Sequence, residues 1–179
     1  MYWDGAGKEY TEKTIDLALK TAKEKGIKHI VVASNTGSTA KLLENCGLNV
    51  VCVTHANGFK EPGENEMDSK MRKELESKGV RVMTGTHVLS GAERGLSSKF
   101  GGIYPLEIMS NTLRMFGQGI KVCVEISVMA LDAGMIPHGE CIIAIGGTNR
   151  GADSAVILKP AHARDILKTK IEEIICKPR

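Results

Sequence analysis

One local layout occurs four times in this chain of 179 residues and leaves it few fold classes. In each copy, a stretch with helical spacing of apolar residues ends at a glycine, and a short strand rich in β-branched residues follows. The four glycines are Gly26, Gly47, Gly79 and Gly134. Helices commonly end in a left-handed residue, and glycine adopts that conformation without a steric penalty. Helices that alternate with strands in this way predict an α/β domain with a mainly parallel sheet.

The segments around these glycines define the expected elements. Residues 11–25 place Ile15, Ala18 and Ala22 on one stripe, which suits a helix packed on a sheet. The strands IVVA, VVCV and CIIAI are apolar on both faces, as strands covered by helices on both sides are. We therefore expect a three-layer α/β sandwich, and the chain length favours a single domain over residues 1–179.

Other segments are assigned from the same patterns. SAVILK predicts a further strand, residues 105–134 predict two helices, and IEEIIC predicts either an edge strand or a last helix. Residues 56–68 and 88–102 read as two long polar loops. Loops of that length in a compact domain are often functional.

Composition excludes several functional classes. No apolar run approaches the roughly 18 residues that span a bilayer, and the N-terminus lacks the layout of a signal peptide, so we expect a cytoplasmic protein. The five cysteines are scattered and form no CxxC pair, which argues against a disulfide framework and against a zinc site. The net charge of +3 is spread without basic blocks, and aromatic residues make up 4%, so a nucleic-acid partner is not expected.

Polar, glycine-rich segments follow four of the predicted strands and mark the expected ligand site. They read SNTGST, THANG, TGTH and GGTNRGAD. In open α/β sheets, ligands bind outside the carboxyl ends of the strands. The residues expected to bind the ligand are Ser34, Asn35, Thr36, Gly37, Ser38, Thr39, Thr54, His55, Thr86, Gly146, Gly147, Thr148, Arg150 and Gly151.

The SNTGST loop, residues 34–39, leads into a predicted helix TAKLLENC. Its backbone N–H groups and the positive end of that helix favour an anion, and phosphate is the anion we expect. In the alternative interpretation, Ser38 or Thr39 only caps the helix and Gly37 only makes the turn. One hydroxyl suffices for a cap and the loop supplies four, so the phosphate interpretation is preferred. On that interpretation, a β-branched side chain at Gly37 crowds the ligand.

The other loops leave more alternatives open. GGTNRGAD fits a plain hairpin turn, while Arg150 favours contact with a phosphate or carboxylate because its planar guanidinium matches those groups. Neither glycine-rich loop has the spacing of the Walker or dinucleotide-binding motifs. His55 and His87 fit equally well as polar loop residues or as catalytic bases. No metal site and no catalytic set can be assigned, so the sequence does not decide whether the chain is an enzyme.

The segment VVASNTGSTAKLLENCGLNVVCVTH resembles the C-terminal domain of pyruvate kinase. In that domain a strand, a Thr-x-Ser-Gly-x-Ser/Thr loop and a helix bind a phosphate of a sugar bisphosphate effector, and Ser34, Thr36, Gly37 and Thr39 match the loop. The run DAGMIPHGECIIAIGGTNRGAD looks like the strand and glycine-rich effector loop of the same domain. Nearly the whole chain is similar to the stand-alone pyruvate kinase α/β domain proteins, most of them archaeal.

This resemblance implies a fold like the pyruvate kinase C-terminal domain. Through the stand-alone family it also implies bound FMN, whose phosphate suits the SNTGST loop. The chain has few rings to stack on a flavin, so an aliphatic pocket is expected. The alternatives are a flavin-dependent oxidoreductase of unknown substrate and a sugar-bisphosphate sensor. The expected partner is a small phosphorylated ligand, with no membrane, and a homo-oligomer is left open.

We expect that this chain does not convert phosphoenolpyruvate and ADP into pyruvate. The resemblance places the catalytic machinery of pyruvate kinase in a separate barrel domain, and 179 residues cannot hold both domains. A lactate dehydrogenase-coupled assay on the purified protein measures this directly. Turnover that scales with the amount of this chain, and persists after contaminating kinase is removed, would contradict the expectation.

Overall fold

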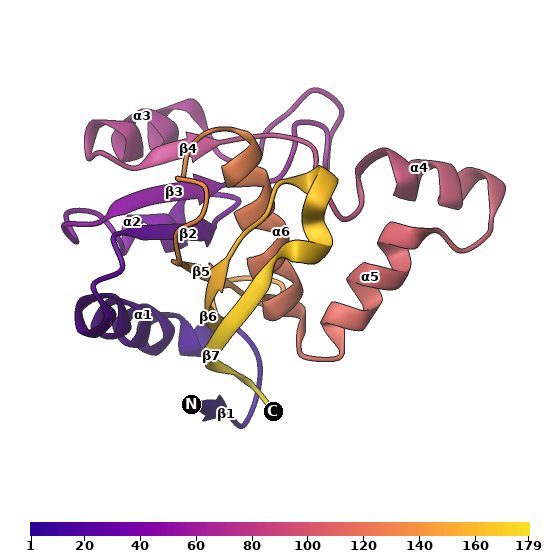
Figure 1. Ribbon diagram of the computed structural model, residues 1–179. Helices are drawn as coiled ribbons and strands as arrows, with labels where there is room; N and C mark the ends of the chain where they lie inside the picture. Colours follow the sequence, from indigo (N-terminus) through magenta and orange to yellow (C-terminus); the bar gives the residue numbers. More distant parts are fainter.

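A seven-stranded sheet runs through the molecule, with helices on both faces (Figure 1). The computed structural model describes all 179 residues. The strands are β1 (Tyr2–Trp3), β2 (His29–Ala33), β3 (Asn49–Val53), β4 (Arg81–Met83), β5 (Ile142–Gly146), β6 (Ser154–Lys159) and β7 (Lys170–Pro178). Their order is β1-β7-β6-β5-β2-β3-β4. Strand β6 is antiparallel to both neighbours and the other pairs are parallel, so the predicted α/β class with a mainly parallel sheet is confirmed.

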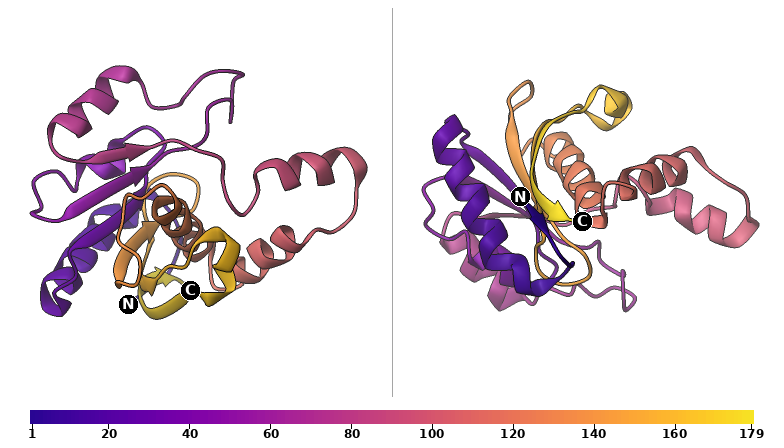
Figure 2. Two further views of the ribbon diagram at one scale, coloured as in Figure 1. Left: turned by 45° about the horizontal axis from the view of Figure 1, so that its top comes forward. Right: turned by 90° about the horizontal axis from the view of Figure 1, so that it is seen from below.

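Six α-helices and two short 3-10 turns complete the fold. The α-helices are α1 (Thr11–Lys25), α2 (Ser38–Lys41), α3 (Ser69–Ser77), α4 (Gly91–Phe100), α5 (Pro105–Arg114) and α6 (Gln118–Asp132), and the 3-10 turns are η1 (Lys8–Tyr10) and η2 (Ala163–Lys168). Figure 2 shows α1 on one side of the sheet and α6 on the other. None of the helices combines the length and apolar character that a bilayer crossing needs.

Both faces of the central strands are buried. In β2, Ile30 and Val32 belong to the core shared with α1 and α3, whereas Val31 belongs to the core shared with α6. Side chains of a strand alternate between the two faces of the sheet, and helices cover both faces here, so every residue in the middle of this strand is apolar. Helix α6 is nearly surrounded and buries twelve of its fifteen residues. The polar loops are therefore confined to the ends of the strands.

Several predicted elements occur where the sequence placed them. Helix α1 has the predicted bounds and ends at Gly26, whose φ is 66°. The segment 105–134 forms α5 and α6. The IEEIIC segment lies in β7, and β7 is not an edge strand, because it lies between β1 and β6. Strand β1 completes that side of the sheet and has only two residues.

Two predicted elements are wrong. The helix expected after the SNTGST loop is the single turn α2, because Leu43 turns into the core and the chain then passes through Asn45 in a left-handed conformation (φ 57°). Residues 88–102, predicted to be a loop, contain the helix α4. Helix α4 buries none of its residues. Its sequence therefore lacks the stripe of apolar residues that faces a core, and this stripe is the pattern from which helices are predicted.

Helix α6 reaches the carboxyl edge of the sheet because small residues let its first turn approach the strands. A Cβ atom added to Gly119 would lie 2.5 Å from Ser154 Cβ and 2.8 Å from Asp153 Oδ1. A Cβ atom added to Gly146, the last residue of β5, would lie 2.6 Å from the carbonyl oxygen of Gly119. These two glycines therefore set how closely α6 and β5 meet.

Replacing Gly119 with alanine should destabilise the fold by about 1–3 kcal/mol, because the added methyl group overpacks the contact with β6. The matched control is Gly95→Ala in α4, where the added methyl group meets open space and should stabilise the protein by about 0.5–1 kcal/mol. Urea denaturation followed by circular dichroism measures both free energies of unfolding. Equal effects of the two substitutions would contradict the close approach at Gly119.

Candidate functional site

A cavity of about 1110 Å³ opens at the carboxyl edge of the parallel strands β5, β2, β3 and β4. Because these strands run in one direction, the loops that follow them meet at this edge. The cavity is lined by Lys8, Glu9, Thr11, Glu12, Ala33, Ser34, Asn35, Thr36, Ser38, Thr39, Leu42, Val53, Thr54, His55, Lys60, Glu66, His87, Gln118, Val122, Glu125, Ile126, Gly147, Asn149, Arg150 and Gly151.

Most of the predicted site residues lie at this cavity. Those that line it are Ser34, Asn35, Thr36, Ser38, Thr39, Thr54, His55, Gly147, Arg150 and Gly151. The four that do not are Gly37, Thr86, Gly146 and Thr148. Gly146 ends β5, and the backbone N–H of Thr148 donates to the Asp153 carboxylate at 3.0 Å. These two residues therefore position the wall without contributing to its surface.

Ser34 caps the short helix α2 from four residues upstream. Its Oγ accepts hydrogen bonds from the backbone N–H of Thr39 at 3.1 Å and of Ala40 at 3.3 Å. Ser34 is buried, so this oxygen meets the capping need of a helix start inside the protein. The cap expected from Ser38 or Thr39 is thus supplied by a different hydroxyl.

The remaining polar groups of the SNTGST loop are left without structural partners. No hydrogen bond within the chain engages the backbone N–H of Asn35, Thr36 or Gly37. The hydroxyls of Thr36 and Ser38 pair only with each other, at 3.3 Å. Successive backbone N–H groups in such a turn form an anion-binding concavity. The loop therefore has donors to spare at the cavity wall.

Gly37 faces away from the cavity. It has a φ of 89°, and a Cβ atom added to it would lie 2.5 Å from Met71 Cγ and 3.2 Å from Leu75 Cδ1, both on α3. Glycine is required here for the left-handed backbone and for the packing of the loop against α3. A valine at Gly37 therefore disturbs the fold first, and the expected direct clash with a ligand does not follow from its position.

The loop between β5 and β6 forms the neighbouring wall and is held by Asp153. One oxygen of this buried carboxylate accepts the backbone N–H groups of Gly7 at 3.2 Å and Thr148 at 3.0 Å, and the other accepts the Ser154 hydroxyl at 2.8 Å. These bonds tie the loop to the N-terminal segment that carries Lys8. The loop connects antiparallel strands, as the hairpin interpretation predicted, and still brings Arg150 to the cavity.

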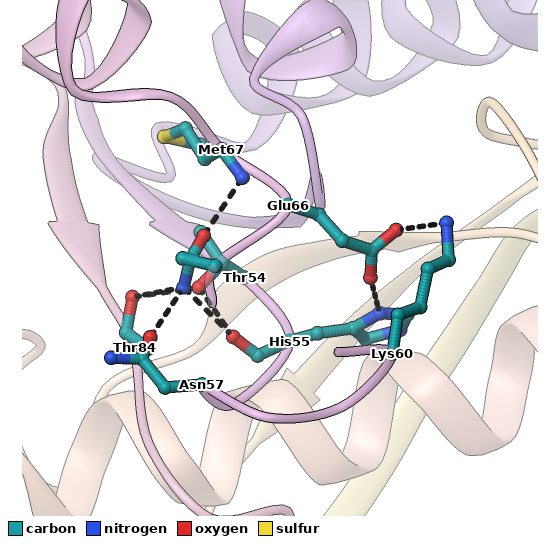
Figure 3. Close-up of polar contacts among 8 residues, drawn as sticks. Thr54, His55, Asn57, Lys60, Glu66, Met67 and Thr84 are labelled. Atoms are coloured by element: carbon teal, nitrogen blue, oxygen red, sulfur yellow. Dashed lines mark hydrogen bonds and ion pairs between the residues drawn. The ribbon is translucent and has the colours of Figure 1, made fainter. Parts of the chain in front are cut away.

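The opposite wall contains a chain of charged and polar side chains on the loop after β3 (Figure 3). His55 Nδ1 donates to Glu66 Oε2 at 2.5 Å, and Lys60 Nζ pairs with Glu66 Oε1 at 2.6 Å. Burial alone would raise the pKa of Glu66, but the hydrogen bonds from Lys60 and His55 outweigh it and lower that pKa. Glu66 is thus held as a carboxylate that orients the His55 ring. The ring stacks on Phe59 and is tilted against the ring of His87.

Asn65 bonds to residues at both ends of this loop. Its Nδ2 donates to Asn57 Oδ1 at 2.9 Å and approaches the His55 carbonyl oxygen at 3.4 Å, and its Oδ1 accepts the backbone N–H of Met67 at 2.8 Å. One amide side chain therefore ties both ends of the loop together. Residues 55–67 are long for a connection but have a defined course.

His87 lies beside the same wall and is kept uncharged. Burial lowers its pKa; the Glu125 carboxylate opposes that shift, and His55 and Lys121 add to it. Glu125 itself forms a buried ion pair with Lys121 at 2.6 Å and accepts the backbone N–H of Leu89 at 3.1 Å. The rings of His55 and His87 lie 5.3 Å apart. The cavity therefore contains a neutral imidazole close to a carboxylate-bound one.

Several lining residues were not predicted from the sequence. Lys8, Lys60, Glu66, Gln118 and Glu125 come from the N-terminal turn, from a loop and from α6. A charged residue in a turn, loop or helix does not by itself predict a binding site, because most charged residues there face solvent. The buried pair Lys121–Glu125 has (i, i+4) spacing, which is common on exposed helix faces. No group of three or more His, Cys, Asp or Glu side chains is arranged to hold a metal ion.

Comparison with known proteins shows which family the chain matches. The model described as "Pyruvate kinase, alpha/beta domain" matches residues 12–158. Among solved structures, a pyruvate kinase from Cryptosporidium parvum matches with a TM-score of 0.45 and 16% identity over 83% of this chain. The pyruvate kinase of that organism in complex with ADP matches with a TM-score of 0.41 and 17% identity over 82% of it. The chain spans 22% of the length of these enzymes.

Acid should destabilise the protein in two steps. His87 has a lowered pKa when folded, so the unfolded chain binds a proton that the folded chain does not, and stability falls as the pH drops below about 6.5. Glu66 also has a lowered pKa, so its contribution is present above about pH 4.5 and is lost below that value. Urea denaturation at a series of pH values resolves the two steps.

The variant His87→Gln should abolish the upper step and leave the lower one. His138→Gln is the matched control, because His138 is exposed and lies outside the cavity. An upper step that survives in His87→Gln, or disappears in His138→Gln, would show that another group causes it.

Proposed function

The chain belongs to the pyruvate kinase α/β domain family, and from that premise we propose that it binds a phosphorylated cofactor or metabolite in the cavity, with FMN the first candidate. The observation that carries the proposal is the set of unpaired donors in the SNTGST loop. Ser34 alone caps α2, so the N–H groups of Asn35 and Thr36 and the hydroxyls of Thr36 and Ser38, all from residues that line the cavity, are available to a ligand.

The phosphate is proposed to bind at this loop. Hydrogen bonds to a charged acceptor are about twice as strong as neutral ones, so a dianion gains most from a group of free donors. Arg150 and Lys8 also line the cavity and add positive charge from the adjacent wall. Helix α2 has only four residues, so its dipole contributes little and the local donors carry the interaction.

The rest of the cavity fits a ring better than a second phosphate. Ala33, Val53, Val122 and Ile126 supply an apolar lining on which the face of an aromatic ring can pack. His55 and His87 also line the cavity and can hydrogen-bond to ring heteroatoms. This distribution supports FMN over a sugar bisphosphate, and the aliphatic lining compensates for the scarcity of aromatic residues.

A second candidate is a flavin-dependent oxidoreductase. The supporting observation is the neutral His87, which lies 5.3 Å from the ring of His55 and can accept a proton at neutral pH. When bound, FMN supplies electron or hydride transfer, and the protein supplies binding, orientation and proton transfer. Reduction of bound FMN by NADH or NADPH would support this candidate over a carrier or sensor.

We also propose that the protein is cytoplasmic. Its resemblance to the stand-alone members of the family, most of them archaeal, fits this location. All five cysteines are free thiols, and Cys52, Cys123 and Cys176 are buried. Burial raises the pKa of the Cys52 thiol to about 12, so this cysteine is an inert core residue. Unpaired thiols are usual in a reducing compartment.

Identification of the ligand is the direct test of the proposed function. Mass spectrometry of the small molecules released from the purified protein should detect a phosphorylated compound, and FMN would also give flavin absorbance. Isothermal titration of the ligand-free protein with FMN, riboflavin and inorganic phosphate then separates the phosphate contribution from that of the ring.

The double variant Thr36→Ala/Ser38→Ala should bind FMN at least tenfold more weakly, which corresponds to about 1.4 kcal/mol, and should unfold at the same urea concentration as the wild type. Both hydroxyls pair only with each other, so their loss affects a ligand more than the fold. Ser77→Ala, which removes an exposed hydroxyl at the end of α3, is the control. Unchanged affinity in the double variant would contradict the proposal that the phosphate binds at this loop.

A further inference from the structure

Helices α4 and α5 form an arm that projects from the body of the molecule (Figures 1 and 2). We define the arm as residues 91–116. Helix α4 has no buried residue, and the only buried residue of α5 is Ser110. Each helix has ten residues, and isolated helices of that length are marginal in water. The arm therefore lacks the packing that stabilises the other helices of the fold.

The arm also concentrates the exposed apolar side chains of the protein. Half of the twelve large hydrophobic residues that are exposed lie within it, and they are 49–83% exposed. They are Leu96, Phe100, Ile103, Ile108, Met115 and Phe116. Leu96 and Phe100 have (i, i+4) spacing and so share one side of α4, and Ile108 and Met115 are seven residues apart and share one side of α5.

The summed exposed area of these six side chains is close to what one partner contributes to a stable protein interface. If a fully exposed large side chain presents about 200 Å², the six residues together expose roughly 800 Å². A standard interface buries about 800 Å² on each partner. Exposed apolar side chains gathered on one projecting element favour an interaction site.

We propose that this surface is the interface with a second copy of the same chain. Within its own molecule α4 buries no residue and is held to α5 by polar contacts of Glu93 and Ser97 with Glu107, so its apolar side chains are left for a partner, and a second copy is the partner that is always present. The charges of the arm are mixed, with Glu93 and Glu107 beside Arg94, Lys99 and Arg114, so two arms can meet across a twofold axis without strong repulsion. An acidic partner or an anionic membrane would call for a surface of one sign.

The position of the arm relates this interface to the cavity. His87 lies just before the arm and Gln118 just after it, and both line the cavity. The Leu89 N–H, on the way into α4, is bound by the Glu125 carboxylate. A dimer formed through the arm therefore holds the segment that carries His87 and the start of α6.

The test measures oligomeric state, which does not depend on any ligand. Sedimentation velocity of the wild type at micromolar concentration should show a dimer. The double variant Phe100→Glu/Ile103→Glu places charges in the apolar surface and should raise the dimer dissociation constant at least 100-fold. Leu167→Glu is the matched control, because Leu167 is 87% exposed but lies in η2, outside the arm, and it should leave the dimer intact.

Hydrogen exchange measured by mass spectrometry provides a second readout. In the double variant, amides of residues 91–116 should exchange faster than in the wild type, while those of β2 and β5 should keep their protection. A monomeric wild type, or a double variant that dimerises as the wild type does, would overturn the proposal. So would a monomer that sediments with anionic lipid vesicles through the arm, since the occupant would then be a membrane. The proposed ligand site is tested separately, by titration of the protein with FMN, so failure of one proposal does not affect the other.

Discussion

Burial of both faces of the central strands is the constraint on which the rest of this structure depends. Residues of β2, β3 and β5 face α1 and α3 on one side and α6 on the other, so no polar side chain can project from the middle of these strands. Polar residues are confined to the strand ends. Because these three strands and β4 are parallel, their carboxyl ends place four polar loops at one edge. The cavity is the consequence of that arrangement.

The loops at this edge are held by a few buried or half-buried polar side chains, and this decides which of their atoms remain available. Ser34 satisfies the start of α2, Asp153 satisfies the N–H groups of two segments, and Asn65 closes the loop after β3. Buried donors and acceptors that lack a partner destabilise a protein by about 1–3 kcal/mol each, so such bonds are needed for the fold itself. Donors that stay free belong to Asn35, Thr36 and Ser38, which line the cavity.

Two sets of histidine, glutamate and lysine flank the apolar part of the cavity. His55, Glu66 and Lys60 belong to one loop, whereas His87 approaches Glu125 and Lys121 of α6. Burying an ion pair such as Lys121–Glu125 brings little stability, because the loss of hydration offsets the attraction. Its place beside a cavity is therefore easier to explain by the electrostatics of the site than by the stability of the core.

The sequence by itself determined the features that depend on local chemistry and periodicity. The apolar strands, the helix at Thr11–Lys25 with its terminal Gly26, and the polar loops at the strand ends could all be predicted, because each follows from neighbouring residues. Only the tertiary structure decided which atoms face the cavity. Ser34 rather than Ser38 caps α2, Gly37 packs against Met71, and Lys8 and Glu125 reach the site from distant segments. These contacts join residues that are far apart in the chain or set the direction of a side chain, and neither property leaves a periodic signal in the sequence.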